Sequence, residues 1–124
     1  MPTNILVVDD NRDICQVIAD MLEPTGAKVH SAFNGAEALG VLEKDRIDLA
    51  IVDLLFAGPV SSDLVVQQAK FRNCQVITMS GTLASDRRGR DLPHPHIVKP
   101  FRTEQLVELV AATLARKGRP SAVL

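Results

Sequence analysis

The chain has 124 residues, a length that suits one domain with its own core, and its 14 basic and 15 acidic side chains leave a formal net charge of −1. This balance argues against a nucleic-acid-binding or membrane-binding surface. Hydrophobic residues make up 46% of the chain, without Trp or Tyr, so the core is expected to be aliphatic. No apolar run approaches the roughly 20 residues of a membrane span, and the first residues lack the basic segment of a signal peptide. Cys15 and Cys74 have no metal-ligand spacing and predict reduced thiols in a cytoplasmic protein.

The chain begins with a strand and a helix. Residues 4–8 are an unbroken aliphatic run, which is typical of a strand buried on both faces of a parallel sheet. A helix is expected next, because apolar side chains recur at the helical period: Ile14, Val17, Ile18, Met21 and Leu22. Asp10 or Asn11 can cap its start, and Pro24-Thr25-Gly26 ends it.

The remaining segments continue this alternation. In order, we expect a strand at 28–32, a helix opened by Asn34 and Gly35, a strand at 48–52 ending at Asp53, a helix at 61–71, a strand at 74–79 ending at Ser80-Gly81, a strand at 96–98 followed by Lys99-Pro100-Phe101, and a helix at about 103–116. Between the last two strands, residues 81–96 have little apolar periodicity and predict at most a short or frayed helix. Alternating strands and helices predict a doubly wound α/β domain with a parallel sheet.

Polar residues close four of the expected strands. Asp9 and Asp10 follow the first strand, Asp53 the third, Ser80 the fourth and Lys99 the fifth. The carboxyl ends of parallel strands meet at one edge of the sheet, where functional groups gather. Three carboxylates together need a cation to offset their repulsion, and an oxygen-only ligand set favours a hard ion such as Mg²⁺.

This constellation resembles the receiver domain of two-component response regulators, the CheY-like family. The resemblance covers residues 4 to about 116, and it implies a flavodoxin-like five-stranded sheet in the order 2-1-3-4-5 with a short or degenerate fourth helix. The motifs that carry it are VVDD at 7–10, AIVD ending at Asp53, Ser80-Gly81, and Lys99-Pro100-Phe101.

The resemblance implies a role for each acid. Asp53 would accept a phosphoryl group as a carboxylate nucleophile. Asp10 would ligate Mg²⁺ directly, Asp9 would hold it through water, and the Leu55 backbone carbonyl would be a further ligand beside Asp53.

The resemblance also assigns the groups that neutralise the phosphoryl oxygens. The Lys99 ammonium would bind one oxygen and the Ser80 hydroxyl another. The Lys99–Pro100 bond is expected to be cis, as is usual in the family and inexpensive before proline.

The chain departs from the family pattern at three positions. Ala57 and Ser61 replace a usual proline and glycine after the phosphorylated aspartate, which puts the path of that loop and the backbone at Leu55 in question. His96 stands where receivers usually carry an aromatic switch residue; as an imidazole it could swing inward and titrate, or it could be an exposed histidine of an edge strand.

Arg87, Arg88 and Arg90 lie in a segment with few apolar anchors, which we expect to become ordered on phosphorylation or partner binding.

The expected function is a phosphorylation-controlled signalling module. It would receive a phosphoryl group from a sensor histidine kinase or a histidine phosphotransfer domain, and would change the surface formed by the fourth helix, fifth strand and last helix. This surface, or the first and last helices, could form a homodimer. A downstream protein or a linked output domain would read the change, with residues 1–118 as the receiver and residues 119–124 as a tail or linker stub. The domain would catalyse only its own phosphoryl transfer and slow dephosphorylation. Two alternatives are a phosphorylation-independent adaptor of the same fold and a small aspartate-dependent phosphatase or phosphotransferase.

Overall fold

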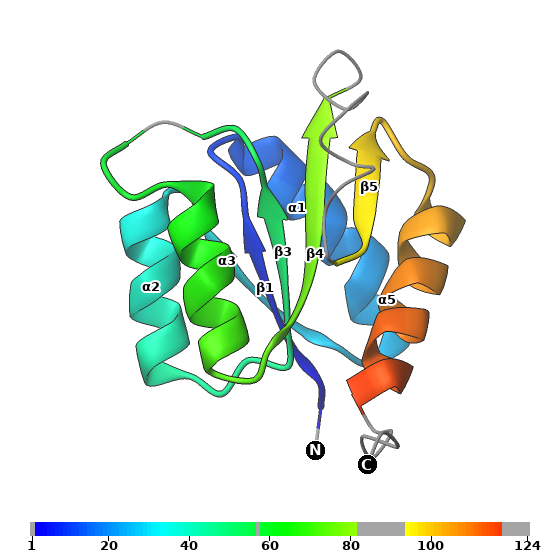
Figure 1. Ribbon diagram of the computed structural model, residues 1–124. Coiled ribbons are helices and arrows are strands. Elements are labelled where there is room, and N and C mark those ends of the chain that lie inside the picture. Colours follow the sequence, from blue (N-terminus) through cyan, green and yellow to red (C-terminus); the bar gives the residue numbers. More distant parts are fainter. Residues whose placement is uncertain (1, 57, 82–93, 118–124) are drawn as a thin grey trace.

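The computed structural model describes residues 2–56, 58–81 and 94–117 (Figure 1). Three expectations fall outside these residues: the short fourth helix and arginine-rich segment within 82–93, the substitution at Ala57, and the tail at 119–124.

Five parallel strands form a single sheet in the order β2-β1-β3-β4-β5, which confirms the predicted topology. The strands are β1 (Asn4–Val8), β2 (Lys28–Ala32), β3 (Leu49–Asp53), β4 (Gln75–Gly81) and β5 (His96–Lys99). The chain therefore crosses from one edge of the sheet back past β1 to the other edge. In open α/β sheets, binding sites usually lie where the strand order reverses, which in this sheet is the edge at the carboxyl ends of β1 and β3.

Helices cover both faces of the sheet. In Figure 1, α1 (Arg12–Leu22) and α5 (Thr103–Lys117) lie on one face, and α2 (Gly35–Lys44) and α3 (Ser62–Phe71) on the other. Polar side chains cap three of the helices, since the Asn11, Asn34 and Ser61 side chains accept hydrogen bonds from the first-turn backbone of α1, α2 and α3. Asn11, rather than Asp10, is thus the cap of α1, which leaves Asp10 available for other contacts.

The strands alternate between two hydrophobic cores. On β1, the side chains of Ile5 and Val7 pack with α1 and α5, and those of Leu6 and Val8 pack with α2 and α3. All four are almost completely buried, and burial of each such side chain contributes roughly 1.5–3 kcal/mol. Tight packing on both faces makes β1 and β3 a rigid base for the residues that follow them.

Two details differ from the sequence expectation. The buried positions of α1 are Cys15, Ile18, Ala19 and Leu22, and Val17 is 47% exposed. Four of the five expected apolar residues do face the core, namely Ile14, Ile18, Met21 and Leu22, and Val17 does not; the small side chains of Cys15 and Ala19 are buried in addition. Strand β4 begins at Gln75 and continues through Ser80 and Gly81, which pair with the end of β5.

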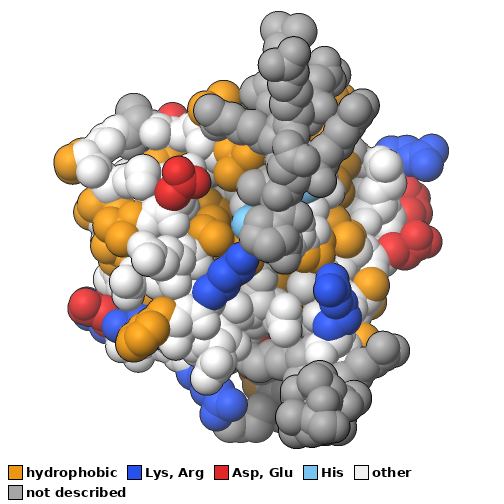
Figure 2. Space-filling model, in the orientation of Figure 1, with side chains coloured by type: hydrophobic (Ala, Val, Ile, Leu, Met, Phe, Trp, Pro, Cys, Tyr) orange, Lys and Arg blue, Asp and Glu red, His pale blue; other side chains and the backbone are white. Residues whose placement is uncertain are grey.

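The visible surface carries mixed charge. Figure 2 shows basic and acidic side chains scattered among apolar ones, both on the side of α2 and α3 and on the side of α5. None of the helices in the described part of the chain has the length and hydropathy that a bilayer span requires.

Candidate functional site

The three acids expected at one edge of the sheet lie together. Asp9 follows β1 directly, Asp10 is the next residue, and Asp53 is the last residue of β3. One carboxylate oxygen from each of the three lies within 4.8 Å of the others. Because the donors are all carboxylate oxygens, this cluster fits a hard divalent cation such as Mg²⁺ rather than zinc.

Lys99, the last residue of β5, reaches into the acid cluster. Its Nζ atom lies 2.7 Å from Asp9 Oδ2 and 3.4 Å from Asp53 Oδ2. Burial alone lowers the pKa of Lys99, but the hydrogen bond to Asp9 and the charges of Asp53 and Asp9 raise it overall, so the ammonium stays charged. The Lys99–Pro100 bond is cis, as the resemblance implies.

Asp9 and Asp10 have different surroundings. Asp9 is 1% exposed, and its two oxygens are engaged: Oδ1 accepts the Asn11 backbone N–H at 2.9 Å, and Oδ2 accepts from Lys99. Asp10 is exposed. The pair is therefore divided into one acid held by the protein and one open to solvent.

Asp53 is buried close to a second carboxylate. It is 5% exposed, and burial together with the charge of Asp9 raises its pKa, although Lys99 opposes the shift. The Leu55 backbone N–H donates to Asp53 Oδ1 at 3.4 Å, and the Leu54 N–H donates to the Met79 carbonyl of β4. These bonds fix the backbone directly after the carboxylate.

Serine hydroxyl groups hold the loop after Asp53. Ser62 Oγ donates to the Leu54 carbonyl at 3.0 Å, and Ser61 Oγ accepts from the Leu64 backbone N–H at 3.2 Å. Ser61, in place of the usual glycine, therefore caps α3. Gly58 has a φ of +121°, a conformation that favours glycine. The glycine of this loop is therefore at position 58 and not at position 61.

His96 does not lie exposed at the sheet edge. Its ring is partly buried and hydrogen-bonded on both sides: Nδ1 lies 2.6 Å from Thr78 Oγ1, and Nε2 lies 2.8 Å from Ser80 Oγ. Ser80 and His96 are recognisable as candidates in the sequence, but Thr78 was not predicted. The signal was present, because Thr78 precedes Ser80 by two residues in one strand, and residues two apart share a face of a sheet.

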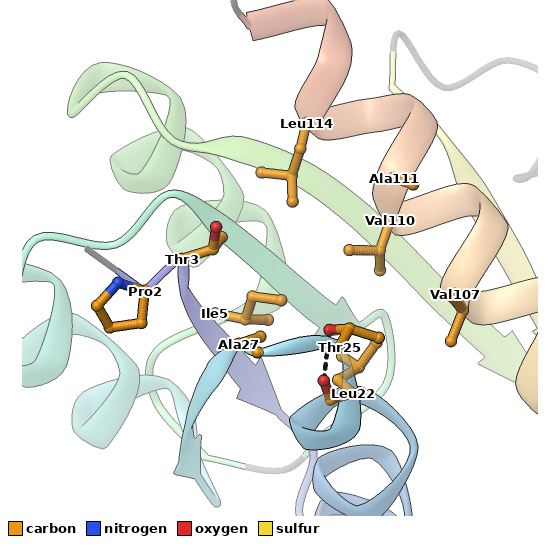
Figure 3. A pocket seen from close by; sticks show the side chains of 11 residues that line it. Pro2, Thr3, Ile5, Leu22, Thr25, Ala27, Val107, Val110, Ala111 and Leu114 are labelled. Atoms are coloured by element: carbon orange, nitrogen blue, oxygen red, sulfur yellow. Dashed lines mark hydrogen bonds between the residues drawn. The ribbon is translucent and has the colours of Figure 1, made fainter.

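An apolar cavity of about 320 Å³ lies at the opposite end of the strands (Figure 3). Its side chains come from the start of β1, the end of α1 and the last turns of α5, and include Ile5, Leu22, Val110 and Leu114. The lining has only apolar and hydroxyl groups, so the groups suited to ionic chemistry lie at the acid cluster.

Comparison with known proteins agrees with this arrangement. The model of the response regulator receiver domain family matches residues 5–111. The chain belongs to the response regulator receiver domain family. It is therefore a receiver domain of two-component signal transduction, a class of domain that binds Mg²⁺ at an acidic pocket and signals through phosphorylation.

Full-length regulators are among the relatives of this receiver domain. It is 28% identical over 116 residues to the heme response regulator HssR of Staphylococcus epidermidis, covering 91% of this chain and 52% of that protein. It is 29% identical to the regulatory protein VanRc of Enterococcus gallinarum, with coverages of 96% and 53%. The chain thus spans about half the length of the curated relatives it matches.

Solved structures show the same fold. A response regulator receiver protein from Sinorhizobium medicae WSM419 superposes with a TM-score of 0.83 at 25% identity, covering 94% of this chain and 97% of that one. NtrX from Brucella abortus, in complex with ATP, superposes with a TM-score of 0.85 at 24% identity, covering 94% of this chain but 28% of that one. At that identity, the second likeness concerns the fold alone.

Proposed function

We propose that this receiver domain accepts a phosphoryl group on Asp53 in a Mg²⁺-dependent reaction. The observation that carries the proposal is the cluster of three carboxylates within 4.8 Å of one another, with the Lys99 ammonium paired to two of them. A buried carboxylate beside a fixed cation is suited to nucleophilic attack on phosphorus, because the negative charge of the transferred group is compensated where it arrives. The intact cluster also argues against an adaptor that does not use phosphorylation.

The surroundings of each acid support a division of labour. Asp53 Oδ forms the new P–O bond while the bond from phosphorus to the donor breaks. Asp10, which is exposed, and Asp53 would hold the ion directly, with the backbone carbonyl of Leu55 as a further ligand. Asp9, whose two oxygens are already engaged, would hold it through water. When bound, Mg²⁺ neutralises one phosphoryl oxygen.

Lys99 and Ser80 would neutralise the other oxygens. Lys99 lies 3.4 Å from Asp53 Oδ2, so its ammonium is next to the position that the phosphoryl group would occupy. Ser80 is one residue beyond Met79, the register partner of Asp53 on the neighbouring strand. Lys99 thus contacts the acceptor carboxylate, and Ser80 follows the register partner of Asp53 at the same end of the sheet. The domain catalyses its own phosphorylation and slow dephosphorylation, without turnover of a separate substrate.

The partners follow from the same chemistry. The donor would be a sensor histidine kinase or a histidine phosphotransfer domain, and a downstream protein or linked output domain would read the change on β4, β5 and α5. Residues 1–118 would be the receiver unit, which agrees with the match of the family model over 5–111. A homodimer would use the surface of β5 and α5 or that of α1 and α5.

Labelling with a small phosphodonor tests the proposal. Incubation with acetyl phosphate and Mg²⁺ should add one phosphoryl group to the wild-type protein, detected as an increase in intact mass. D53N should remain unlabelled, because the amide oxygen is a poor nucleophile. The control is D20N, which changes an exposed acid of α1. Equal labelling of D53N and the wild type would contradict the assignment of Asp53.

The metal assignment has its own test. D10A should lose Mg²⁺ binding, measured by calorimetric titration, while the circular dichroism spectrum of the fold is unchanged. It should be as stable as the wild type or more so without metal, because it removes a charge beside Asp9 and Asp53. Normal Mg²⁺ affinity in D10A would show that the ion does not depend on this carboxylate.

A further inference from the structure

His96 joins two buried hydroxyl groups of β4. Thr78 and Ser80 are both 0% exposed, and each has its oxygen within hydrogen-bond distance of one ring nitrogen of His96. The arrangement follows from the sheet. Thr78 is the register partner of His96, and Ser80 is two residues further along the same face. The imidazole is therefore held at both nitrogens.

The neutral imidazole has one donor and one acceptor. The hydrogen bonds that connect Ser80, His96 and Thr78 must therefore run in one of two directions. In one, Ser80 O–H donates to Nε2 and Nδ1–H donates to Thr78. In the other, Thr78 O–H donates to Nδ1 and Nε2–H donates to Ser80 Oγ. Only the second direction leaves the Ser80 proton free to point away from His96.

We propose that His96 is a positioning residue for Ser80: its Nε2–H donates to Ser80 Oγ and so directs the Ser80 proton toward a phosphoryl oxygen on Asp53. This inference rests on the proposed function, in which Ser80 donates to that oxygen. His96 transfers no proton, and the only covalent change remains the P–O bond formed at Asp53. The Thr78 hydroxyl donates to Nδ1, so the second ring nitrogen of His96 also has a hydrogen-bond partner.

The coupling must act in both directions. When a phosphoryl oxygen accepts a hydrogen bond from the Ser80 O–H group, Ser80 Oγ can in turn accept a hydrogen bond from His96. This favours the His96 tautomer with its proton on Nε2. The negative charge of the phosphoryl group also favours the protonated, imidazolium form of His96. Burial lowers the pKa of free His96, so the neutral ring is the starting state. His94 interacts electrostatically with His96, Lys70 on α3 hydrogen-bonds His94, and Lys99 lies further along β5.

Nitrogen and carbon NMR of the histidine rings tests the inference directly. With Mg²⁺ and beryllium fluoride, a tetrahedral phosphoryl mimic, His96 should be the Nε2–H tautomer and its pKa should rise. In S80A, the hydrogen bonds that connect the anion with His96 are lost while the anion remains. The rise in the pKa of His96 should therefore be much smaller. His30 on β2, at the other edge of the sheet, supplies a reference signal. The Nδ1–H tautomer in the bound wild type, or an equal rise in S80A, would overturn the positioning role.

Kinetics provide the second test. H96F, which has no ring donor, should be labelled by acetyl phosphate roughly three- to tenfold more slowly, the range expected for the loss of one hydrogen bond. H96Q, whose amide can donate to Ser80, should recover part of the rate. An unchanged rate in H96F, with the label still on Asp53, would contradict this inference alone. Absence of label from the wild-type protein would instead contradict the proposed function.

Discussion

At the scale of single residues, Lys99 holds together carboxylates that would otherwise repel each other. It is the side chain that approaches both Asp9 and Asp53, at 2.7 and 3.4 Å. Those two acids are almost fully buried, so water does little to screen their repulsion. A cation fixed by the fold therefore makes a compact acid cluster possible before a metal binds.

Removal of this cation should destabilise the protein in a metal-dependent way. K99M should lower the free energy of unfolding by about 3 kcal/mol at neutral pH in chelator, because it leaves buried charge without its partner. The deficit should shrink when Mg²⁺ is added. It should also shrink in acid, because a carboxyl whose pKa is raised in the folded state costs stability only as pH rises through that pKa. Urea unfolding measures each case, with K44M on the exposed end of α2 as the control.

At the scale of elements, the loop after β3 is seated against the start of α2. A Cβ atom added at Gly35 would come within 2.4 Å of the Val60 carbonyl oxygen and 2.7 Å of Val60 Cβ. Gly40, in the same helix, has open space around its Cα. The first glycine is required by this contact, and the second is not. The contact matters for the site because Val60 belongs to the loop that follows Asp53.

These two glycines make a matched pair for mutation. G35A should destabilise the protein by roughly 1–3 kcal/mol, because the backbone of the loop must move to admit the methyl group. G40A should stabilise it by about 0.5–1 kcal/mol through helix propensity. Thermal or urea unfolding of both variants measures the difference. Equal effects of the two substitutions would show that the contact between α2 and the loop carries no energy.

At the scale of the whole molecule, stability depends on pH through two partly buried histidines that are neutral in the folded state. Burial, followed by the charges of Lys70 and His96, lowers the pKa of His94 to about 4, and burial lowers the pKa of His96. The folded state thus binds fewer protons than the unfolded chain, whose histidines titrate near 6.5. Their contribution is fully present above that pH and is lost as pH falls.

Acidification should therefore weaken the wild-type protein more than a variant without His94. Between pH 7 and pH 5, the free energy of unfolding should fall by on the order of 1–2 kcal/mol more in the wild type than in H94Q. Asp53, whose pKa is raised, makes the folded state more stable as pH falls, but it is present in both proteins. The difference between the two pH profiles therefore isolates the contribution of His94. Urea titrations at several pH values supply the measurement, and parallel pH profiles would contradict this account.

Much of the fold could be predicted from periodicity, because the strands and helices differ clearly in pattern. The unbroken run of β1 and the strand-end acids were sufficient to place Asp9, Asp10 and Asp53 at one edge. On α1, one position was predicted wrongly, since Val17 has the right spacing and only packing shows that the smaller Cys15 faces the core. Hydrophobicity alone favoured the larger side chain.

The connection between His96, Ser80 and Thr78 could not be predicted in the same way. It depends on the register between β4 and β5, which a short edge strand of four residues does not encode in its own sequence. The pairing of Lys99 with Asp9 and Asp53 likewise depends on how far β5 extends along β4. Such contacts become visible only when the strands are set side by side.

We propose that the acid cluster serves the phosphorylation of Asp53, and mapping the modified residue tests this role most directly. The protein is labelled with acetyl phosphate and Mg²⁺, the acyl phosphate is reduced with borohydride, and the peptides are sequenced by mass spectrometry. We predict that the reduced residue is at position 53 and that chelation of Mg²⁺ abolishes the signal. Modification at Asp9 or Asp10 instead, or labelling that persists in chelator, would contradict the account.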